Sequence, residues 1–186
     1  KLHGGVGPSD LEAEDSDAVR AGGPNLAKHI ENVRQYGLEP VVALNRFAGD
    51  SDAELEAARA VCREAGAVVE LADYREQGGA GGLDLAEAVM AAVARAREAQ
   101  LKPRPIYRPE DSAEQKIEAV ARRIYGADGV DYSAEAQQDL QSAREHGFGA
   151  LPVCIAKTQN SLSDDAALRG RPSGFTGRVR RVVVSA

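Results

Sequence analysis

Two aromatic side chains, Phe47 and Tyr74, are the first candidates for ligand binding in this sequence. The chain has only three phenylalanines, five tyrosines and no tryptophan, so a core would normally use most of them. Phe47 and Tyr74 instead come just after two short apolar segments that are typical of buried strands. An exposed aromatic face can stack on a flat heterocycle, because such rings prefer offset stacking. Position alone equally allows both rings to be loop anchors packed on the edge of a sheet.

Polar residues surround Phe47 in the segment 45–50 (NRFAGD). The amide of Asn45 presents both a donor and an acceptor, as a group that binds a purine edge must, and Asp50 adds a carboxylate. Asn and Asp also begin turns and cap helices. Both interpretations therefore stay open for this pair, as nucleotide-binding residues or as parts of a structural turn.

Glycines dominate the segment 78–82 (GGAGG). Gly78, Gly79 and Gly81 would let the backbone approach a ligand closely and adopt positive φ angles. The segment matches neither GxxxxGK[ST] nor GxGxxG, so it is not a known phosphate-binding loop. A flexible turn before a helix is the alternative interpretation.

A third cluster of polar residues follows an apolar segment near position 156. It contains one ammonium, several hydroxyls and two carboxylates, and its candidate residues are Lys157, Thr158, Ser161 and Asp164. This cluster is either a nucleotide-binding loop or a solvated structural loop. No metal site is predicted, because the three histidines are scattered and the sequence contains no CxxC or HExxH motif. No histidine lies near a suitable serine or cysteine in sequence, so no catalytic triad is indicated and the sequence assigns no catalytic residue.

The first half of the chain alternates predicted strands and helices. Helix patterns cover 25–36, 53–65 and 83–96, and apolar strand patterns cover 40–44 and 67–71. This order predicts an α/β fold with a parallel sheet flanked by helices. The loops after the two strands would then leave the same edge of the sheet, where open α/β sheets bind ligands.

The second half predicts a smaller α/β unit after a proline-rich connector. We expect an α/β segment with the strand-end loops at 1–98, a connector at 99–110 and the smaller unit at 111–186. In that unit, helices are predicted at 113–125 and 134–146, the latter capped by Ser133, and strands at 151–156 and 178–184.

The 186 residues carry a net charge of −6, which argues against a nucleic-acid partner. No apolar run approaches the length of a membrane span and no secretory signal is recognisable, so we expect a cytoplasmic protein. Cys62 and Cys154 lie in apolar contexts and are predicted to be reduced core residues. Because the chain begins at Lys1 rather than methionine and ends in a predicted strand, we expect a fragment of a longer protein.

These segments, in this order, resemble the formate–tetrahydrofolate ligase family. The resemblance runs nearly from end to end, and its most specific part is 151–165 (LPVCIAKTQNSLSDD). The other matching segments are 1–6, 25–32, 40–47, 78–82, 124–130, 170–172 and the final predicted strand.

The resemblance implies an ATP-dependent ligase of one-carbon metabolism that formylates tetrahydrofolate to 10-formyltetrahydrofolate, through formyl phosphate. Its substrates would be formate, ATP with Mg²⁺, and tetrahydrofolate, with no covalently held cofactor, and the family forms homotetramers. The family's phosphate loop belongs to an N-terminal part that this chain lacks. The isolated chain is therefore expected to be inactive with ATP. The alternative is a non-catalytic remnant or interaction module that has kept the fold.

The resemblance also suggests a folate pocket. The family holds the pterin between two aromatic side chains, and Phe47 matches the first. Arg75 stands where the family has a tryptophan, so either Arg75 or the adjacent Tyr74 would supply the second face. The predicted folate-binding residues are Phe47, Tyr74, Arg75, Gly78, Gly79 and Gly81.

Overall fold

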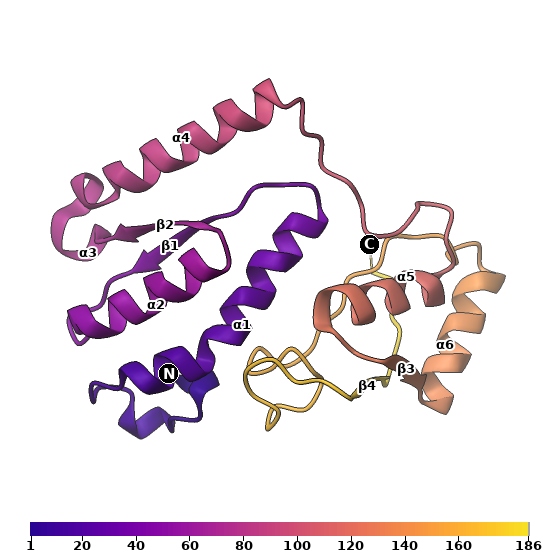
Figure 1. Ribbon diagram of the computed structural model, residues 1–186. Helices are drawn as coiled ribbons and strands as arrows, with labels where there is room; N and C mark the ends of the chain where they lie inside the picture. The colour runs from indigo at the N-terminus through magenta and orange to yellow at the C-terminus, as the bar shows by residue number, and fades with distance from the viewer. Residues whose placement is uncertain (186) are drawn as a thin grey trace. The chain divides into compact units, whose positions relative to one another are not determined.

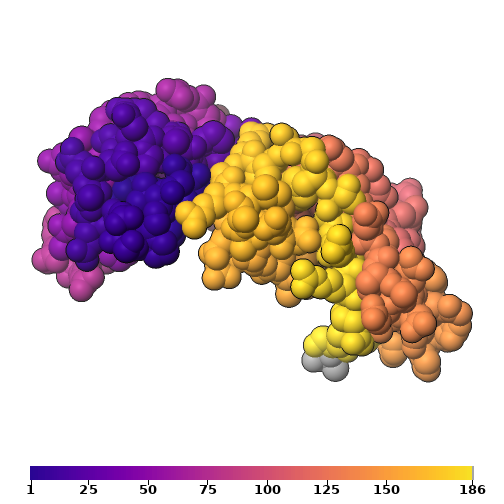
Figure 2. All heavy atoms as spheres, turned by 90° about the horizontal axis from the view of Figure 1, so that it is seen from below, coloured from indigo at the N-terminus to yellow at the C-terminus, as the bar shows by residue number. Residues whose placement is uncertain are grey.

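The computed structural model describes residues 1–185 and divides into two compact units, Lys1–Arg104 and Pro105–Ala186. The boundary falls inside the segment 99–110 that the sequence predicts as a connector. The space-filling view shows the residues of the first unit, indigo to magenta, gathered into one body (Figure 2). Each unit has its own small parallel sheet.

The sheet of the first unit pairs β1 (Val41–Asn45) with β2 (Val68–Ala72). The two strands are parallel, with Val41 opposite Val68, which confirms the predicted parallel arrangement. Both strands end at the same edge of the sheet, so the loops that follow them start side by side.

Helices cover both faces of this sheet (Figure 1). α1 (Ser16–Gln35) packs on α2 (Asp52–Glu64) on one side, and α4 (Leu83–Glu98) lies on the other. Two short 3₁₀ turns, Leu2–Gly4 and Pro8–Asp10, precede α1. The core forms where α1 and α2 meet the sheet, and contains Ile30, Cys62 and Ala67 with Leu26, Val42, Ala65 and Val69 packed against them.

α1 begins nine residues earlier than the sequence predicts. Pro24 lies inside this helix, whose start is capped by the Asp15 carboxylate accepting from Ala18 N at 2.7 Å. Gly23 explains why this segment stays helical, because a Cβ there would lie 2.7 Å from a methyl of Val61 on α2. Close helix packing therefore outweighs the poor helix propensity of proline and glycine.

The second unit contains α5 (Ala113–Val120), a π-helical turn (Ala121–Tyr125), β3 (Gly129–Tyr132), α6 (Ala134–Glu145) and β4 (Thr176–Val179). β3 and β4 pair in parallel. The predicted α/β class is confirmed for both units, and α6 begins at the predicted cap, where Ser133 accepts from Ala136 N.

Three strand predictions in this unit need correction. The segment 151–156 is not a strand, the final strand ends at Val179 rather than 184, and β3 was not predicted. Pro152 has no N–H to contribute to a ladder, and 151–156 has no partner strand within residues 1–185. β3 was not predicted because Gly126 and Gly129 are typical of a turn and the charged Asp131 interrupts the apolar pattern.

The extended segment 150–153 is held by hydrogen bonds from side chains and not by pairing with another strand. The ammonium of Lys116, 1% exposed, donates to the carbonyls of Pro109, Ala150 and Leu151 at 2.7, 2.6 and 3.3 Å. A buried lysine is tolerated here because all three of its donors have acceptors.

The two cysteines differ, although both are free. Cys62 is buried as predicted, and burial raises the pKa of its thiol. Cys154 is exposed, which corrects the prediction of a core residue, because its segment is not covered by a neighbouring strand. From residue 1 to 185, no helix combines the length and apolar character needed to cross a bilayer.

Candidate functional site

The candidate site lies at the carboxyl edge of the first sheet. Asn45 and Ala72 are paired at the ends of β1 and β2, and Arg46 N donates to Ala72 O at 3.1 Å just beyond the last pair. This bond keeps the two strands together up to the point where their loops begin. The loop that carries Phe47 and the loop that carries Tyr74 therefore leave from neighbouring positions.

A tight turn holds Phe47 in the first loop. The carboxylate of Asp50 accepts from Phe47 N at 2.9 Å, and Asp50 N donates to Phe47 O at 3.0 Å. Asp50 thus takes the turn-forming role that the sequence left open. The Phe47 ring is 58% exposed, so it is not a buried loop anchor. Asn45 is also exposed at the end of its strand.

The second loop folds back on itself through α3 (Tyr74–Gln77) and a 3₁₀ turn (Gly78–Gly82). Tyr74 packs directly on Gly82, where a Cβ would lie 2.1 Å from the tyrosine ring, yet half of the side chain remains exposed. Arg75 points from the same turn of helix and is exposed. The structure thus brings both candidates for a second stacking face to one short helix.

The glycines of this loop have two different roles. Gly81 is required by packing, because a Cβ there would lie 2.2 Å from the carbonyl oxygen of Asp73. Gly78 and Gly79 have no atoms within 4 Å of an added Cβ, and Gly78 has φ +57°. Open space therefore lies above the first two glycines, whereas Gly81 faces the protein.

One residue of this edge was missed by the sequence reasoning. Asp73 directly follows β2, is only 9% exposed, and accepts from Gln77 Nε2 at 3.1 Å through Oδ2. The signal for it was the same as for Asn45, a polar residue immediately after a strand.

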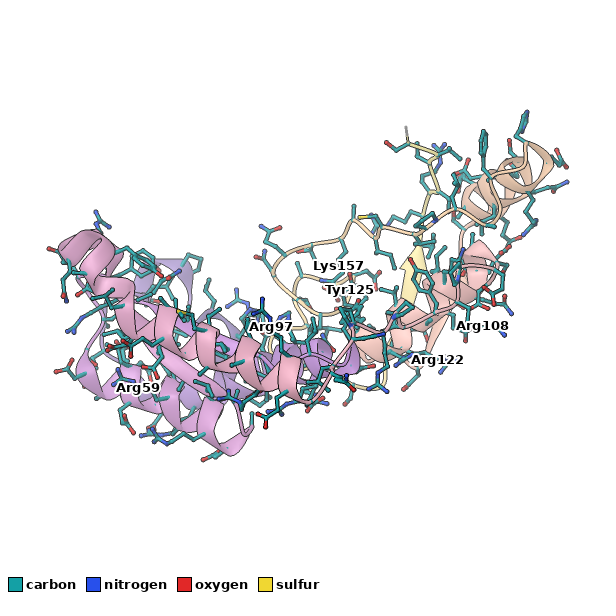
Figure 3. All side chains as sticks on the ribbon, turned by 90° about the horizontal axis from the view of Figure 1, so that it is seen from above. Arg59, Arg97, Arg108, Arg122, Tyr125 and Lys157 are labelled. Carbon is teal, nitrogen blue, oxygen red and sulfur yellow. The ribbon has the colours of Figure 1, made fainter. Side chains whose placement is uncertain are left out.

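The polar loop of the second unit is described separately. The Lys157 ammonium donates to Thr158 O at 2.7 Å and to Ser161 O, and lies 5.1 Å from the centre of the Tyr125 ring (Figure 3). Burial lowers the pKa of Lys157, an effect that the Asp164 carboxylate opposes. The ammonium is therefore held by its own loop.

Buried serines complete that loop. Ser161 Oγ donates to Leu168 O and accepts from Ser163 N, the latter at 2.9 Å. Ser163 Oγ in turn donates to Asp165 O at 2.9 Å. These internal bonds give the segment 157–165 a defined shape without a ligand.

The described part of the chain offers no cluster of metal ligands. Among residues 1–185, no three or more histidine, cysteine or carboxylate side chains are grouped to hold an ion. Phe47, Tyr74, Arg75 and Asn45 thus present exposed side chains at this edge, and Asp73 a nearly buried carboxylate.

Comparison with known proteins identifies the family of this chain. The family model for formate–tetrahydrofolate ligase matches residues 1–186. The formate–tetrahydrofolate ligase of Symbiobacterium thermophilum is 48% identical over 187 residues, an alignment that covers 100% of this chain and 33% of that protein. The chain thus spans about a third of the length of the curated relative that it matches, and it belongs to the formate–tetrahydrofolate ligase family.

Proposed function

We propose that this chain forms the tetrahydrofolate side of the active site in an ATP-dependent ligase that joins formate to tetrahydrofolate, giving 10-formyltetrahydrofolate. Membership of the family supports the reaction. The observation that supports the role of this part is the exposed Phe47 ring, held at the sheet edge beside the glycine-rich loop. ATP, its Mg²⁺ and formate are the other substrates that the family implies.

Phe47 is suited to stack on the pterin. Leaving a phenylalanine exposed forgoes about 1.5–3 kcal/mol of burial, which a flat ligand would recover by covering the ring. The turn closed by Asp50 already restricts the backbone of Phe47. Less conformational entropy is therefore lost on binding than from a flexible loop.

Arg75 is the better candidate for the opposite face. Tyr74 is already packed on Gly82, so using its ring for a ligand would break an existing contact. The Arg75 side chain is exposed on the same short helix, and a guanidinium can stack on a planar ring. Gly78 and Gly79 would let the ligand approach the backbone of the loop, because nothing occupies the space above them.

The remaining candidate residues fall into two groups, those whose polar groups bind within their own loop and one that is free to contact a ligand. Lys157, Thr158 and Ser161 act in our proposal as structural residues, because their polar groups bind within the loop 157–165. Asp164 supports the same loop through its charge beside Lys157. Asn45 remains the candidate for contact with a nucleotide, since its exposed amide ends β1.

Calorimetric titration of tetrahydrofolate tests this proposal. The protein is expressed at the full length of its reading frame, as wild type and as Phe47→Ala. Loss of the stacked ring should weaken binding by about 1–3 kcal/mol, or roughly 5- to 150-fold. Phe148→Ala, which removes an exposed phenylalanine of the other unit, serves as the control and should bind normally.

Two results would contradict the proposal in different ways. Unchanged affinity in Phe47→Ala would place the pocket elsewhere in the molecule. Absence of tetrahydrofolate binding by the wild type would favour the alternative, a non-catalytic module that has kept the fold.

A further inference from the structure

Asp73 carries a buried carboxylate oxygen that has no hydrogen-bond partner. Oδ2 accepts from Gln77 Nε2 at 3.1 Å, but Oδ1 has no donor, and it is the one buried side-chain oxygen or nitrogen atom within residues 1–185 left in this state. An ionised carboxylate ordinarily accepts several hydrogen bonds. Burying one of its oxygens without a donor costs stability, so such an atom in a folded protein calls for an explanation.

The glycine-rich loop packs against the backbone of Asp73. Asp73 N donates to Gly81 O at 3.0 Å, and the Asp73 carbonyl lies so close to Gly81 that a Cβ there would be 2.2 Å away. The loop 78–82 therefore folds directly back over Asp73. Gly78 and Gly79, which have open space around them, give the loop the backbone freedom to move away again.

We propose that Asp73 is a specificity-determining residue whose Oδ1 accepts a hydrogen bond from the exocyclic 2-amino group of the pterin, once the loop 78–82 moves off it. This inference rests on the proposed folate site and names one polar contact within it. The 2-amino-4-oxo ring of a pterin presents neighbouring N–H donors along one edge. A carboxylate accepts only, so it complements that edge and pairs more strongly than a neutral acceptor.

The location of Asp73 agrees with this role. It directly follows β2 at the carboxyl edge of the sheet and immediately precedes Tyr74 and Arg75, which are the candidates for the second stacking face. A ring held between Phe47 and Arg75 would have its edge, not its face, available to a group in the strand-end loop. Stacking and edge recognition would then come from adjacent residues.

The experiment removes the contact in two ways, by changing the ligand and by changing the protein. Binding of tetrahydrofolate, and of its analogue with the 2-amino group replaced by methyl, is measured by calorimetry with the full-length protein. The wild type should prefer tetrahydrofolate about 10- to 100-fold, the range for a hydrogen bond to a charged group. Asp73→Ala should bind tetrahydrofolate weaker by a similar factor and should distinguish the two ligands less than about threefold.

Gln77→Ala is the matched control. It removes the partner of Oδ2 and leaves Oδ1 in place, so it should keep the preference for the 2-amino ligand. If Asp73 acted only by shaping the loop, Gln77→Ala would reproduce the loss seen in Asp73→Ala. Asp73→Asn, which keeps the shape and removes the charge, separates a folding failure of the alanine variant from loss of the contact.

The outcomes separate this inference from the proposed function. If the wild type and Asp73→Ala discriminate equally between the two ligands while Phe47→Ala weakens binding, the inference is wrong and the folate site stands. If Phe47→Ala also binds normally, the folate site itself is wrong. Equal affinity of the wild type for both ligands would show that Oδ1 is satisfied by water and not by the pterin.

Discussion

Glu54 is predicted to stabilise the first unit through one buried carboxylate, and Glu54→Gln tests it. Its side chain is 5% exposed, and Oε1 lies 2.8 Å from both Lys1 Nζ and Asp15 N. Oε2 accepts from Ser51 N at 3.2 Å, completing a capping box at the start of α2. The carboxylate thus joins the N-terminal segment to the loop that follows Phe47. A glutamine would place an amide N–H against one of these donors.

The magnitude follows from the pKa. The Lys1 ammonium and the Asp15 and Ser51 amides hold the pKa of Glu54 down to about 2, from an ordinary value of 4.5. A folded-state pKa below the unfolded one means stability that is present above the unfolded value and lost as pH falls. Each pKa unit corresponds to about 1.4 kcal/mol, so Glu54→Gln should cost up to about 3.5 kcal/mol at pH 7. The difference should shrink between pH 4.5 and pH 2.

Urea unfolding followed by circular dichroism measures this at pH 7 and at pH 3. Because the chain has two units, hydrogen exchange of α2 amides assigns the transition to the first unit. Glu56→Gln on the same helix is the control, since its pair with Arg63 is exposed and should contribute little to stability. A loss below about 0.5 kcal/mol in Glu54→Gln, or one that is equal at both pH values, would refute the reasoning.

Three further predictions concern stability and reactivity. Lys116→Met leaves three carbonyls without their donor and should destabilise the second unit by about 2–4 kcal/mol in urea unfolding, whereas a change below about 1 kcal/mol would mean that water replaces the ammonium. Gly81→Ala should lower the melting temperature of the first unit while Gly79→Ala should not, and equal effects would contradict the packing role of Gly81. A thiol reagent should modify Cys154 in the folded protein and Cys62 only after unfolding, and rapid labelling of Cys62 in the native state would show that the core opens.

The substitution at Arg75 is where this chain departs from the aromatic pair that the resemblance implies. Tyr74→Ala and Arg75→Ala, titrated with tetrahydrofolate, show which side chain provides the second face. If Arg75 stacks, its removal weakens binding and Tyr74→Ala leaves it nearly unchanged. The reverse order would mean that Tyr74 leaves its position on Gly82 when ligand binds.

Local sequence pattern was sufficient for the first unit. Continuous apolar runs at 40–44 and 67–71, each followed by a helix pattern, identified β1 and β2 and their parallel pairing. Capping residues located α2 and α6 to within a residue or two. The same order indicated which edge of the sheet carries the candidate ligand loops. These features are encoded by neighbours in the chain, so the sequence alone determines them.

Contacts between distant residues decided the rest. The run 151–156 is as apolar as β1, but a strand also needs a partner, and β4 pairs with β3 instead. α1 extends through Pro24 only because Gly23 packs against α2. That one oxygen of Asp73 is buried without a partner is visible only in the structure. The sequence by itself thus determined the α/β class, the first sheet and the family resemblance, whereas the strands of the second unit, the length of α1 and the burial of single side chains depended on which surfaces meet in three dimensions.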